Sequence, residues 1–171
     1  EEIELTAPVD ILRRLEIPVT LVGVQGRKVE GAHGMVMQAD MLLVDVDATK
    51  YAGVVLPGGG ASWLLRDTPL VLKLVREMHT AGKLVGAICA APIALQAAGI
   101  LEGRTITCYP AADVTKEFTG DTKVCSDQTV TDGNLVTGRG PGAALEFGFA
   151  LATALGKGKD VPALRQGMCV V

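Results

Sequence analysis

The segment from Leu84 to Leu95 limits the possible folds more than any other part of the chain. Leu84–Ile88 is an apolar run without polar alternation, and it predicts a strand that is buried on both faces. Small residues and Pro92 follow Cys89 and predict the first turns of a helix. A buried strand that passes directly into a helix is typical of a mostly parallel α/β sheet.

The same alternation continues along the chain. The patterns predict a helix over 6–15, capped by Thr6 with Pro8 in its first turn, and a second helix over 68–82. They also predict strands over 19–24, 53–60 and 104–108, an apolar piece at 41–46, a hairpin over 128–138 and a long helix over 141–155. Strands that alternate with helices indicate a mostly parallel sheet covered on both faces.

Composition restricts the class of protein. The chain has 171 residues, which favours a single domain over 1–171, and 49% of them are hydrophobic while 4% are aromatic. A net charge of −3 lacks the basic excess of a nucleic-acid surface. No apolar stretch has the length of a membrane span, and the first residues do not resemble a signal peptide, so we expect no membrane association and a cytoplasmic location.

Four cysteines and two histidines limit the metal chemistry. Cys89, Cys108, Cys125 and Cys169 form no C-x-x-C pair, and we expect free thiols, no metal and no cofactor. Three of them are interpreted as core or surface thiols (Cys108, Cys125 and Cys169), and His79 is expected to be solvated on a charged helix.

Cys89 is the candidate nucleophile because it falls on the turn between a strand and a helix. Such a turn exposes the side chain, and a helix N-terminus can lower a thiol pKa from about 8.5 into the range of roughly 3.5 to 7.5. A buried cysteine that acts only as a small hydrophobe is the alternative. Gly58–Gly60 also follows a predicted strand, so its backbone is expected to face the same crevice. The amides of Gly59 and Ala90 would then stabilise an oxyanion on a substrate.

Four motifs in this order resemble the ThiJ/PfpI superfamily, most closely the branch of the protein deglycases and the bacterial YajL proteins. They are "EEIELTAPVDILRR", "VVLPGGG", "VGAICAAPIAL" and "TGRGPGAALEFGFAL". The resemblance covers nearly the whole chain. It implies a flavodoxin-like three-layer sandwich, a homodimer and a reactive cysteine on a nucleophile elbow, which corresponds to Cys89.

The resemblance also assigns roles to other residues. An acidic residue that shares a proton with the cysteine corresponds to Glu4, although by itself this residue looks like a solvated glutamate at a helix entrance. Pocket positions follow from the matching motifs: Gly58, His33, Arg139, Gly140 and Pro141.

The chain departs from the family pattern in two places. Tyr109 stands where relatives commonly have a histidine, and no histidine follows Cys89. Cys89-Ala90 also replaces the Cys-His pair of the PfpI-type proteases, so peptidase activity is not expected. Relatives begin with a central strand that precedes the "EEIE" segment, and we expect that this first strand of the family is missing from the present sequence.

These features favour a glutathione-independent glyoxalase or deglycase-type enzyme that acts on small α-oxoaldehydes such as methylglyoxal. The Cys89 thiolate would attack the aldehyde, and Glu4 would transfer protons. A non-enzymatic oxidative-stress sensor or chaperone that uses the same oxidisable cysteine is the alternative. A structural dimer with an incidental cysteine is a third possibility.

Overall fold

Parallel strands form the middle layer of the molecule. The computed structural model describes residues 1–170 and places four strands in one sheet in the order β5-β6-β10-β9. β5 (Gly53–Leu56), β6 (Leu84–Ile88) and β10 (Leu135–Gly138) are parallel, and β9 (Thr129–Asp132) is antiparallel to β10. The predicted hairpin is therefore confirmed, and so is the mostly parallel sheet.

Three smaller strand pairs surround this sheet. β1 (Val22–Gly23) pairs with β4 (Met41–Leu42), and β7 (Thr105–Thr107) pairs with β8 (Lys123–Cys125), both in parallel. β2 (Lys28–Glu30) and β3 (Val36–Gln38) form an antiparallel hairpin.

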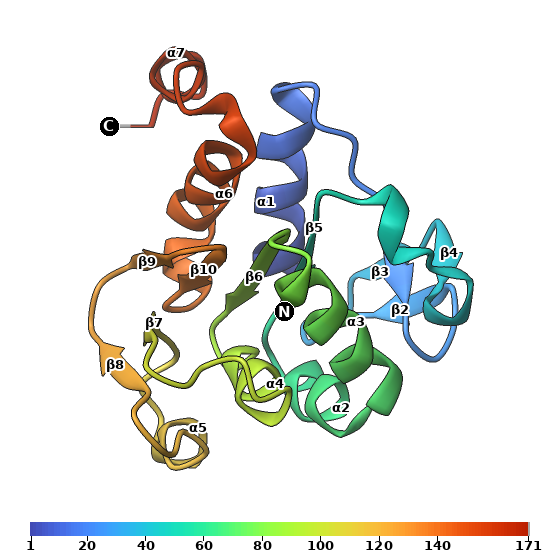
Figure 1. Ribbon diagram of the computed structural model, residues 1–171. Coiled ribbons are helices and arrows are strands. Elements are labelled where there is room, and N and C mark those ends of the chain that lie inside the picture. Colours follow the sequence, from blue (N-terminus) through green and yellow to red (C-terminus); the bar gives the residue numbers. More distant parts are fainter. Residues whose placement is uncertain (171) are drawn as a thin grey trace.

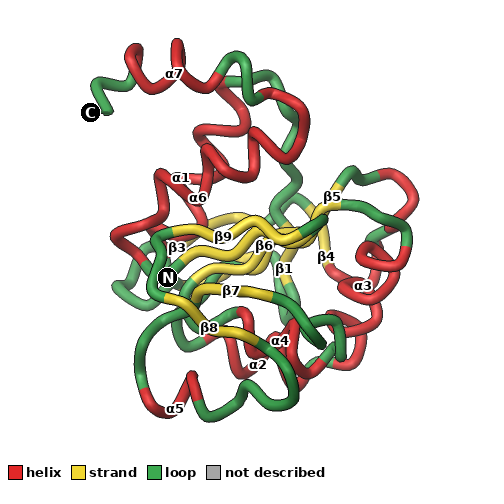
Figure 2. The backbone as a smooth tube through the Cα atoms, turned by 60° about the vertical axis from the view of Figure 1, so that its left-hand side comes forward, coloured by secondary structure: helices red, strands yellow, loops and turns green. Residues whose placement is uncertain are grey.

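Helices cover both faces of the strands, as Figures 1 and 2 show. α1 (Glu2–Arg14), α6 (Ala144–Ala152) and α7 (Val161–Gly167) lie on one side. α2 (Ala61–Asp67), α3 (Pro69–Thr80) and α4 (Pro92–Ala97) lie on the other, and α5 (Ala112–Thr115) follows β7. This layering agrees with the flavodoxin-like sandwich. No helix in residues 1–170 combines the length and the apolar character that crossing a membrane requires.

β6 is the centre of the hydrophobic core. All five of its residues are buried. Val85 and Ala87 pack into the cluster on the α2–α4 side, whereas Leu84 and Ile88 pack into the cluster that contains Phe147 of α6. The prediction of a strand buried on both faces is confirmed, because successive side chains enter opposite layers.

Several predicted boundaries are wrong. α1 begins at Glu2, so Thr6 is not a cap, and its hydroxyl donates to the Glu2 carbonyl inside the helix at 2.9 Å. Glutamates in the first turn favour an earlier start, because they complement the positive end of the helix dipole. The strand expected over 19–24 is reduced to Val22–Gly23. The helix expected over 141–155 starts as a 3₁₀ turn at Pro141–Ala143 and ends in a π-helical turn at Thr153–Lys157.

Candidate active site

Cys89 occupies a sharp turn between β6 and α4. Its φ of +65° is a left-handed conformation that a residue with a side chain rarely adopts, and such strain commonly accumulates at functional sites. The turn is held from both directions, because the Cys89 N–H donates to Gly138 O at 2.8 Å and the Cys89 carbonyl accepts from Tyr109 N at 2.9 Å. Only 7% of the residue is exposed. The predicted elbow is present in the structure.

Glu4 lies beside this cysteine, although it belongs to α1. The residue is 1% exposed, so it is not the solvated glutamate that the alternative interpretation suggested. Its Oε2 accepts from the Gly58 N–H at 2.9 Å, and its Oε1 is buried without a hydrogen-bond partner among residues 1–170. One carboxylate oxygen is therefore fixed, and the other is left free to exchange a proton.

Gly58 is required for this close approach. A Cβ atom at Gly58 would lie 2.5 Å from Glu4 Oε2, 2.6 Å from Cys89 Cβ and 2.8 Å from the carbonyl oxygen of Ile88. All three distances are shorter than van der Waals contact. The absent side chain thus lets the α1 carboxyl and the elbow meet on the same side of the β5 loop.

The carboxyl and the thiol influence one another's pKa. Burial, the charge of Glu4 and its hydrogen bond to the thiol raise the pKa of Cys89 to about 12. The expected lowering by the helix N-terminus is therefore wrong for this arrangement, since α4 has only six residues and the ionised carboxylate opposes a thiolate. Burial also raises the pKa of Glu4. A neutral Glu4 removes the opposing charge, so the pair can hold one proton between oxygen and sulfur.

Two backbone amides face the sulfur. The N–H groups of Gly59 and Ala90 act on the Cys89 thiol and partly offset the rise of its pKa. Gly59 has a φ of +74°, which turns its amide in a way that a residue with a side chain would resist. The structure thus brings together the two amides that were expected to stabilise an oxyanion.

His33 does not join the cysteine in the described contacts. Its backbone N–H donates to Glu2 Oε1 at 2.6 Å, and its ring Nδ1 lies 3.1 Å from Glu2 Oε2. The His33 side chain is 71% exposed. It therefore belongs to a loop that Glu2 holds against α1, and not to the sulfur.

Glu2 is the site-proximal residue that the sequence analysis missed. It is buried, and it also lies within 3.4 Å of Met35 N. Glu1, Glu2 and His33 bring one potential metal-ligating atom each within 4.8 Å of one another. The repeated acidic residues of the "EEIE" segment were the available signal. Because the carboxylate of Glu2 already accepts from the loop, we assign the group a structural role.

Tyr109 and the "RGPG" segment form the neighbouring rim. Tyr109 is 45% exposed, and a Cβ atom on Gly140 would lie 3.3 Å from Cδ2 of its ring. Arg139 donates its backbone N–H to Gln128 O at 2.9 Å, and Pro141 opens the 3₁₀ turn before α6. The segment directly follows Gly138, which binds the elbow. Tyr109 thus contacts the elbow through its backbone, and the "RGPG" segment continues directly from the strand end that binds it.

The remaining thiols have different surroundings. Cys108 is buried and its burial raises its pKa to about 11, whereas Cys125 is half-buried and Cys169 is exposed. None of the four cysteines is in a disulfide. Of the four cysteines, Cys89 is the one whose pKa the buried Glu4 carboxyl raises.

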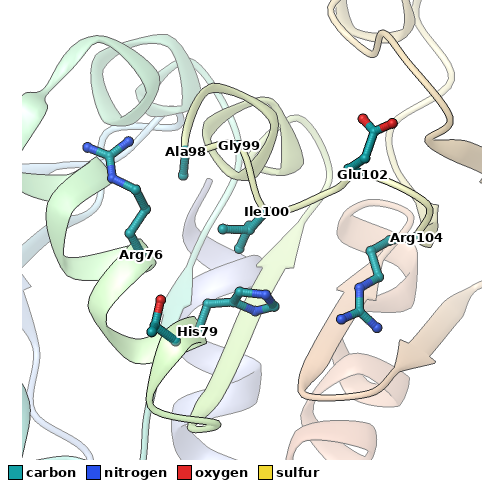
Figure 3. Close-up of a pocket in the computed structure, with 8 residues that line it drawn as sticks. Arg76, His79, Ala98, Gly99, Ile100, Glu102 and Arg104 are labelled. Atoms are coloured by element: carbon teal, nitrogen blue, oxygen red, sulfur yellow. The ribbon is translucent and has the colours of Figure 1, made fainter.

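A cavity of about 350 Å³ lies away from Cys89, between the C-terminal part of α3 and the loop 98–104 (Figure 3). The charged ends of Arg76, Glu102 and Arg104 point in different directions there. His79 is half-buried with its Nδ1 enclosed, so the prediction of a solvated histidine is wrong. The surrounding groups do not converge on a common point, and this cavity is not a second candidate site.

Comparisons with known proteins give a consistent result. The DJ-1/PfpI family matches residues 1–154. Protein dj-1beta of Drosophila melanogaster is 36% identical over 173 residues, which cover 99% of this chain and 91% of that protein. The glutathione-independent glyoxalase DJR-1.2 of Caenorhabditis elegans is 31% identical over 170 residues, which cover 99% of this chain and 90% of that protein. The crystal structure of Drosophila melanogaster DJ-1beta superposes on this structure with a TM-score of 0.93 and 36% sequence identity. The superposition covers 100% of this chain and 92% of that chain.

Proposed function

Because the chain belongs to the DJ-1/PfpI family, we propose that it converts small α-oxoaldehydes such as methylglyoxal to hydroxyacids through Cys89, without glutathione or another cofactor. The observation that carries this proposal is the buried carboxyl of Glu4 beside the thiol on a strained turn. The name of the Caenorhabditis elegans relative, a glutathione-independent glyoxalase, supports the same substrate class.

The first step is the attack of the sulfur on the aldehyde carbon. With the shared proton on Glu4, the Cys89 thiolate adds to the carbonyl and forms a C–S bond, while the electron pair of the C=O bond moves to oxygen. The amides of Gly59 and Ala90 stabilise this oxyanion as it develops. Glu4 then donates its proton to the oxygen, which gives a neutral hemithioacetal.

The second stage moves a hydrogen from one carbon to the next. The Glu4 carboxylate removes the proton from the former aldehyde carbon, and the electron pair forms a C=C bond while the former ketone oxygen becomes negative, which gives an enediolate. Glu4 returns this proton to the neighbouring carbon, and the hydroxyl proton on the former aldehyde carbon passes to the former ketone oxygen, so that a C=O bond forms next to sulfur. The product is a thioester of the hydroxyacid on Cys89. Water hydrolyses this thioester, so that lactate is released and the thiol is restored.

Tyr109 contributes at the rim. In this mechanism the phenol of Tyr109 donates a hydrogen bond to a substrate oxygen, whereas the buried Glu4 carboxyl, whose pKa is raised, exchanges the proton. Proton transfer is therefore assigned to Glu4, and Tyr109 to substrate orientation.

The redox-sensor alternative uses the same atoms. The amides of Gly59 and Ala90, which face the sulfur, would also stabilise the oxygen atoms of a sulfinic acid on Cys89. In that case peroxide would convert Cys89 to the sulfinate, and the protein would show no turnover of aldehydes.

We also propose that the protein is a homodimer. Ile3, Met35 and Val36 are each about half exposed, and the Glu2 carboxylate binds the loop that carries Met35 to the start of α1. Apolar side chains gathered in this way are typical of an interface. Sedimentation equilibrium would show a mass of two chains, and a single-chain mass at micromolar concentration would contradict the proposal.

The test of function is the production of lactate from methylglyoxal by the purified protein, with Cys89→Ser as the matched control. We expect lactate from the unmodified chain and none above background from the variant. A second assay with a glycated peptide separates a deglycase, which releases the free amine, from a glyoxalase. If the protein produces neither lactate nor free amine but peroxide converts Cys89 to the sulfinate, the enzyme proposal is wrong and the sensor alternative replaces it.

A further inference from the structure

Trp63, the single tryptophan of the chain, lies in the first turn of α2. The loop directly before this helix carries the Gly59 amide, which acts on the Cys89 thiol. Side chains of an α-helix lean toward its N-terminus, so the indole leans back toward this loop. The largest side chain of α2 is therefore at the end of the helix that lies beside the reactive cysteine.

The indole packs on the apolar cluster that surrounds the elbow. Trp63 is partly buried, and the buried members of the cluster that it contacts include Cys89, Ala90 and Val114. Ala111, which directly precedes α5, is also partly buried against this cluster. We call Trp63, Ala111 and Val114 the apolar wall, because they bring together apolar side chains of α2 and of the α5 segment near the thiol.

An ion pair holds the two sides of the apolar wall together. Arg66 follows Trp63 by one helical turn, and its Nη1 lies 3.2 Å from Oε2 of Glu117, which follows α5. α2 also packs against α4, the helix that begins at the elbow, and Figures 1 and 2 show α2, α4 and α5 at the same end of the molecule. The position of the indole is thus fixed from three helices.

We propose that Trp63 determines substrate specificity in the α-oxoaldehyde reaction proposed above, on which this inference rests. The indole contacts the substituent of an aldehyde bound to Cys89 and favours a planar aromatic group, as in phenylglyoxal, over the methyl group of methylglyoxal. Cys89 and the Gly59 amide hold the reacting carbonyl, so the substituent extends from this point along the apolar wall. An indole offers a large flat apolar surface, and aromatic rings in contact gain more than their buried area alone provides.

The first experiment compares kcat/KM for phenylglyoxal and methylglyoxal, with mandelate and lactate as the measured products. The variants are Trp63→Ala, Trp63→Phe and the control Tyr51→Ala. Tyr51 is a partly buried aromatic residue before β5, at the end of that strand opposite to Gly58. The ratio of the two kcat/KM values is compared between variants, since the different intrinsic reactivities of the two aldehydes then cancel.

We expect the ratio of phenylglyoxal to methylglyoxal to fall by at least about 10-fold in Trp63→Ala, because the aromatic substituent loses its apolar partner. Trp63→Phe should restore the ratio to within about threefold. Tyr51→Ala should lower the thermal midpoint and leave the ratio within about threefold. An unchanged ratio in Trp63→Ala, with methylglyoxal still converted, would overturn this inference and leave the proposed function intact. An equal fall in Tyr51→Ala would also overturn it, since general loosening would then explain the effect.

The second experiment does not depend on turnover, because the fluorescence of a single tryptophan reports on Trp63 directly. The probes are the α-hydroxyketones 2-hydroxyacetophenone and hydroxyacetone, which differ in a phenyl and a methyl substituent. We expect 2-hydroxyacetophenone to quench Trp63 saturably and to protect Cys89 from iodoacetamide with the same midpoint, at a concentration at least about 10-fold lower than hydroxyacetone requires.

The two experiments separate the inference from the proposed function. If neither aldehyde is converted, the proposed function is wrong, and the binding experiment decides about Trp63. Saturable quenching together with protection of Cys89 would still support an aromatic subsite beside the cysteine. Quenching that rises linearly with the probe and leaves Cys89 unprotected would overturn it.

Discussion

Glu2 and Glu4 lie two positions apart in the first turn of α1, and both are buried, yet their carboxyl groups are opposite in character. Burial alone would raise the pKa of Glu2, but hydrogen bonds from the backbone and ring of His33 and from Met35 lower it to about 2. Burial raises the pKa of Glu4, which receives one backbone donor, from Gly58, and has the Cys89 thiol as its neighbour.

The difference shows that the number of donors around a buried carboxyl decides its protonation. Glu2 is a fixed anion that holds a loop, and such a group has no proton to give. Within residues 1–170, one oxygen of Glu4 accepts no hydrogen bond and the pKa of the carboxyl is raised, so Glu4 can accept and donate a proton at a reacting atom. Only the second environment suits acid–base catalysis.

The largest expected effect is on enzymatic turnover, which should depend on Glu4 and hardly on Glu2. Glu4→Gln should abolish lactate formation from methylglyoxal, a loss of at least about 1,000-fold in kcat/KM, because the amide cannot transfer protons. Cys89→Ser should be equally inactive. The matched variant Glu2→Gln should stay within about threefold of the unmodified protein. Equal losses at the two glutamates would contradict the division of roles.

Gly58→Ala tests the close approach of carboxyl and elbow. The new Cβ would push against Glu4 Oε2 and Cys89 Cβ, so we expect a loss of about 100-fold in kcat/KM and a lower thermal midpoint. Gly60→Ala is the control, since a Cβ at Gly60 meets nothing within 4 Å and its φ is −59°. Normal activity in the Gly58 variant would show that the contact does not position Glu4.

Tyr109→Phe should cost no more than about tenfold in kcat/KM, roughly 1.4 kcal/mol of transition-state stabilisation. In the proposed mechanism the phenol orients the substrate, whereas Glu4 transfers the proton. The measurement is kcat and KM for methylglyoxal, and the change should fall mainly on KM. A loss comparable to that of Cys89→Ser would make the tyrosine an obligatory acid or base and would refute the assignment to Glu4.

The smallest effect concerns the loop that Glu2 holds. The pKa of Glu2 is lowered from 4.5 to about 2. The ionised carboxylate therefore stabilises the folded protein above pH 4.5, and this stabilisation is lost as the pH falls toward 2. The pKa of His33 is raised from 6.5, mainly by its hydrogen bond to Glu2. The protonated ring therefore stabilises the folded protein below pH 6.5, and this stabilisation is lost as the pH rises through the pKa that His33 has in the folded protein.

We therefore expect the loop 31–35 to be held most firmly between about pH 4.5 and 6.5. Its amide protection factors, which correct for intrinsic exchange, should be a few-fold higher in this range than outside it. Hydrogen exchange of His33 and Met35 across this range is the measurement. The profile should become flat in Glu2→Gln. An unchanged profile in that variant would show that another group holds the loop.

Local sequence patterns correctly predicted those helices and strands that are specified by interactions within their own segment. The helix at Pro69–Thr80 was expected over 68–82, since Val71, Val75 and Met78 repeat on one face and are buried. The β9–β10 hairpin was expected around Asp132-Gly133, and Gly133 has the positive φ that such a turn requires. In both cases the interactions that specify the element lie within a few residues.

Boundaries that depend on distant contacts were predicted poorly. The start of α1 was placed at Thr6, because the buried environment of Glu2 and Glu4 is supplied by the loop 31–35 and by Gly58. The segment 19–24 has the composition of a strand, but only Val22–Gly23 finds a ladder, on β4. A strand needs a partner, and the pattern of one segment does not state where that partner lies.

The sequence by itself determined that Cys89 stands on a turn between a buried strand and a helix, and that glycines follow the neighbouring strand, because both depend on local apolar and small residues. Only the tertiary structure decided that Glu4 reaches this turn, that its pKa is raised while that of Glu2 is lowered, and that His33 serves the loop. Burial and hydrogen-bond donors set these properties, and here they come from segments far apart in the chain.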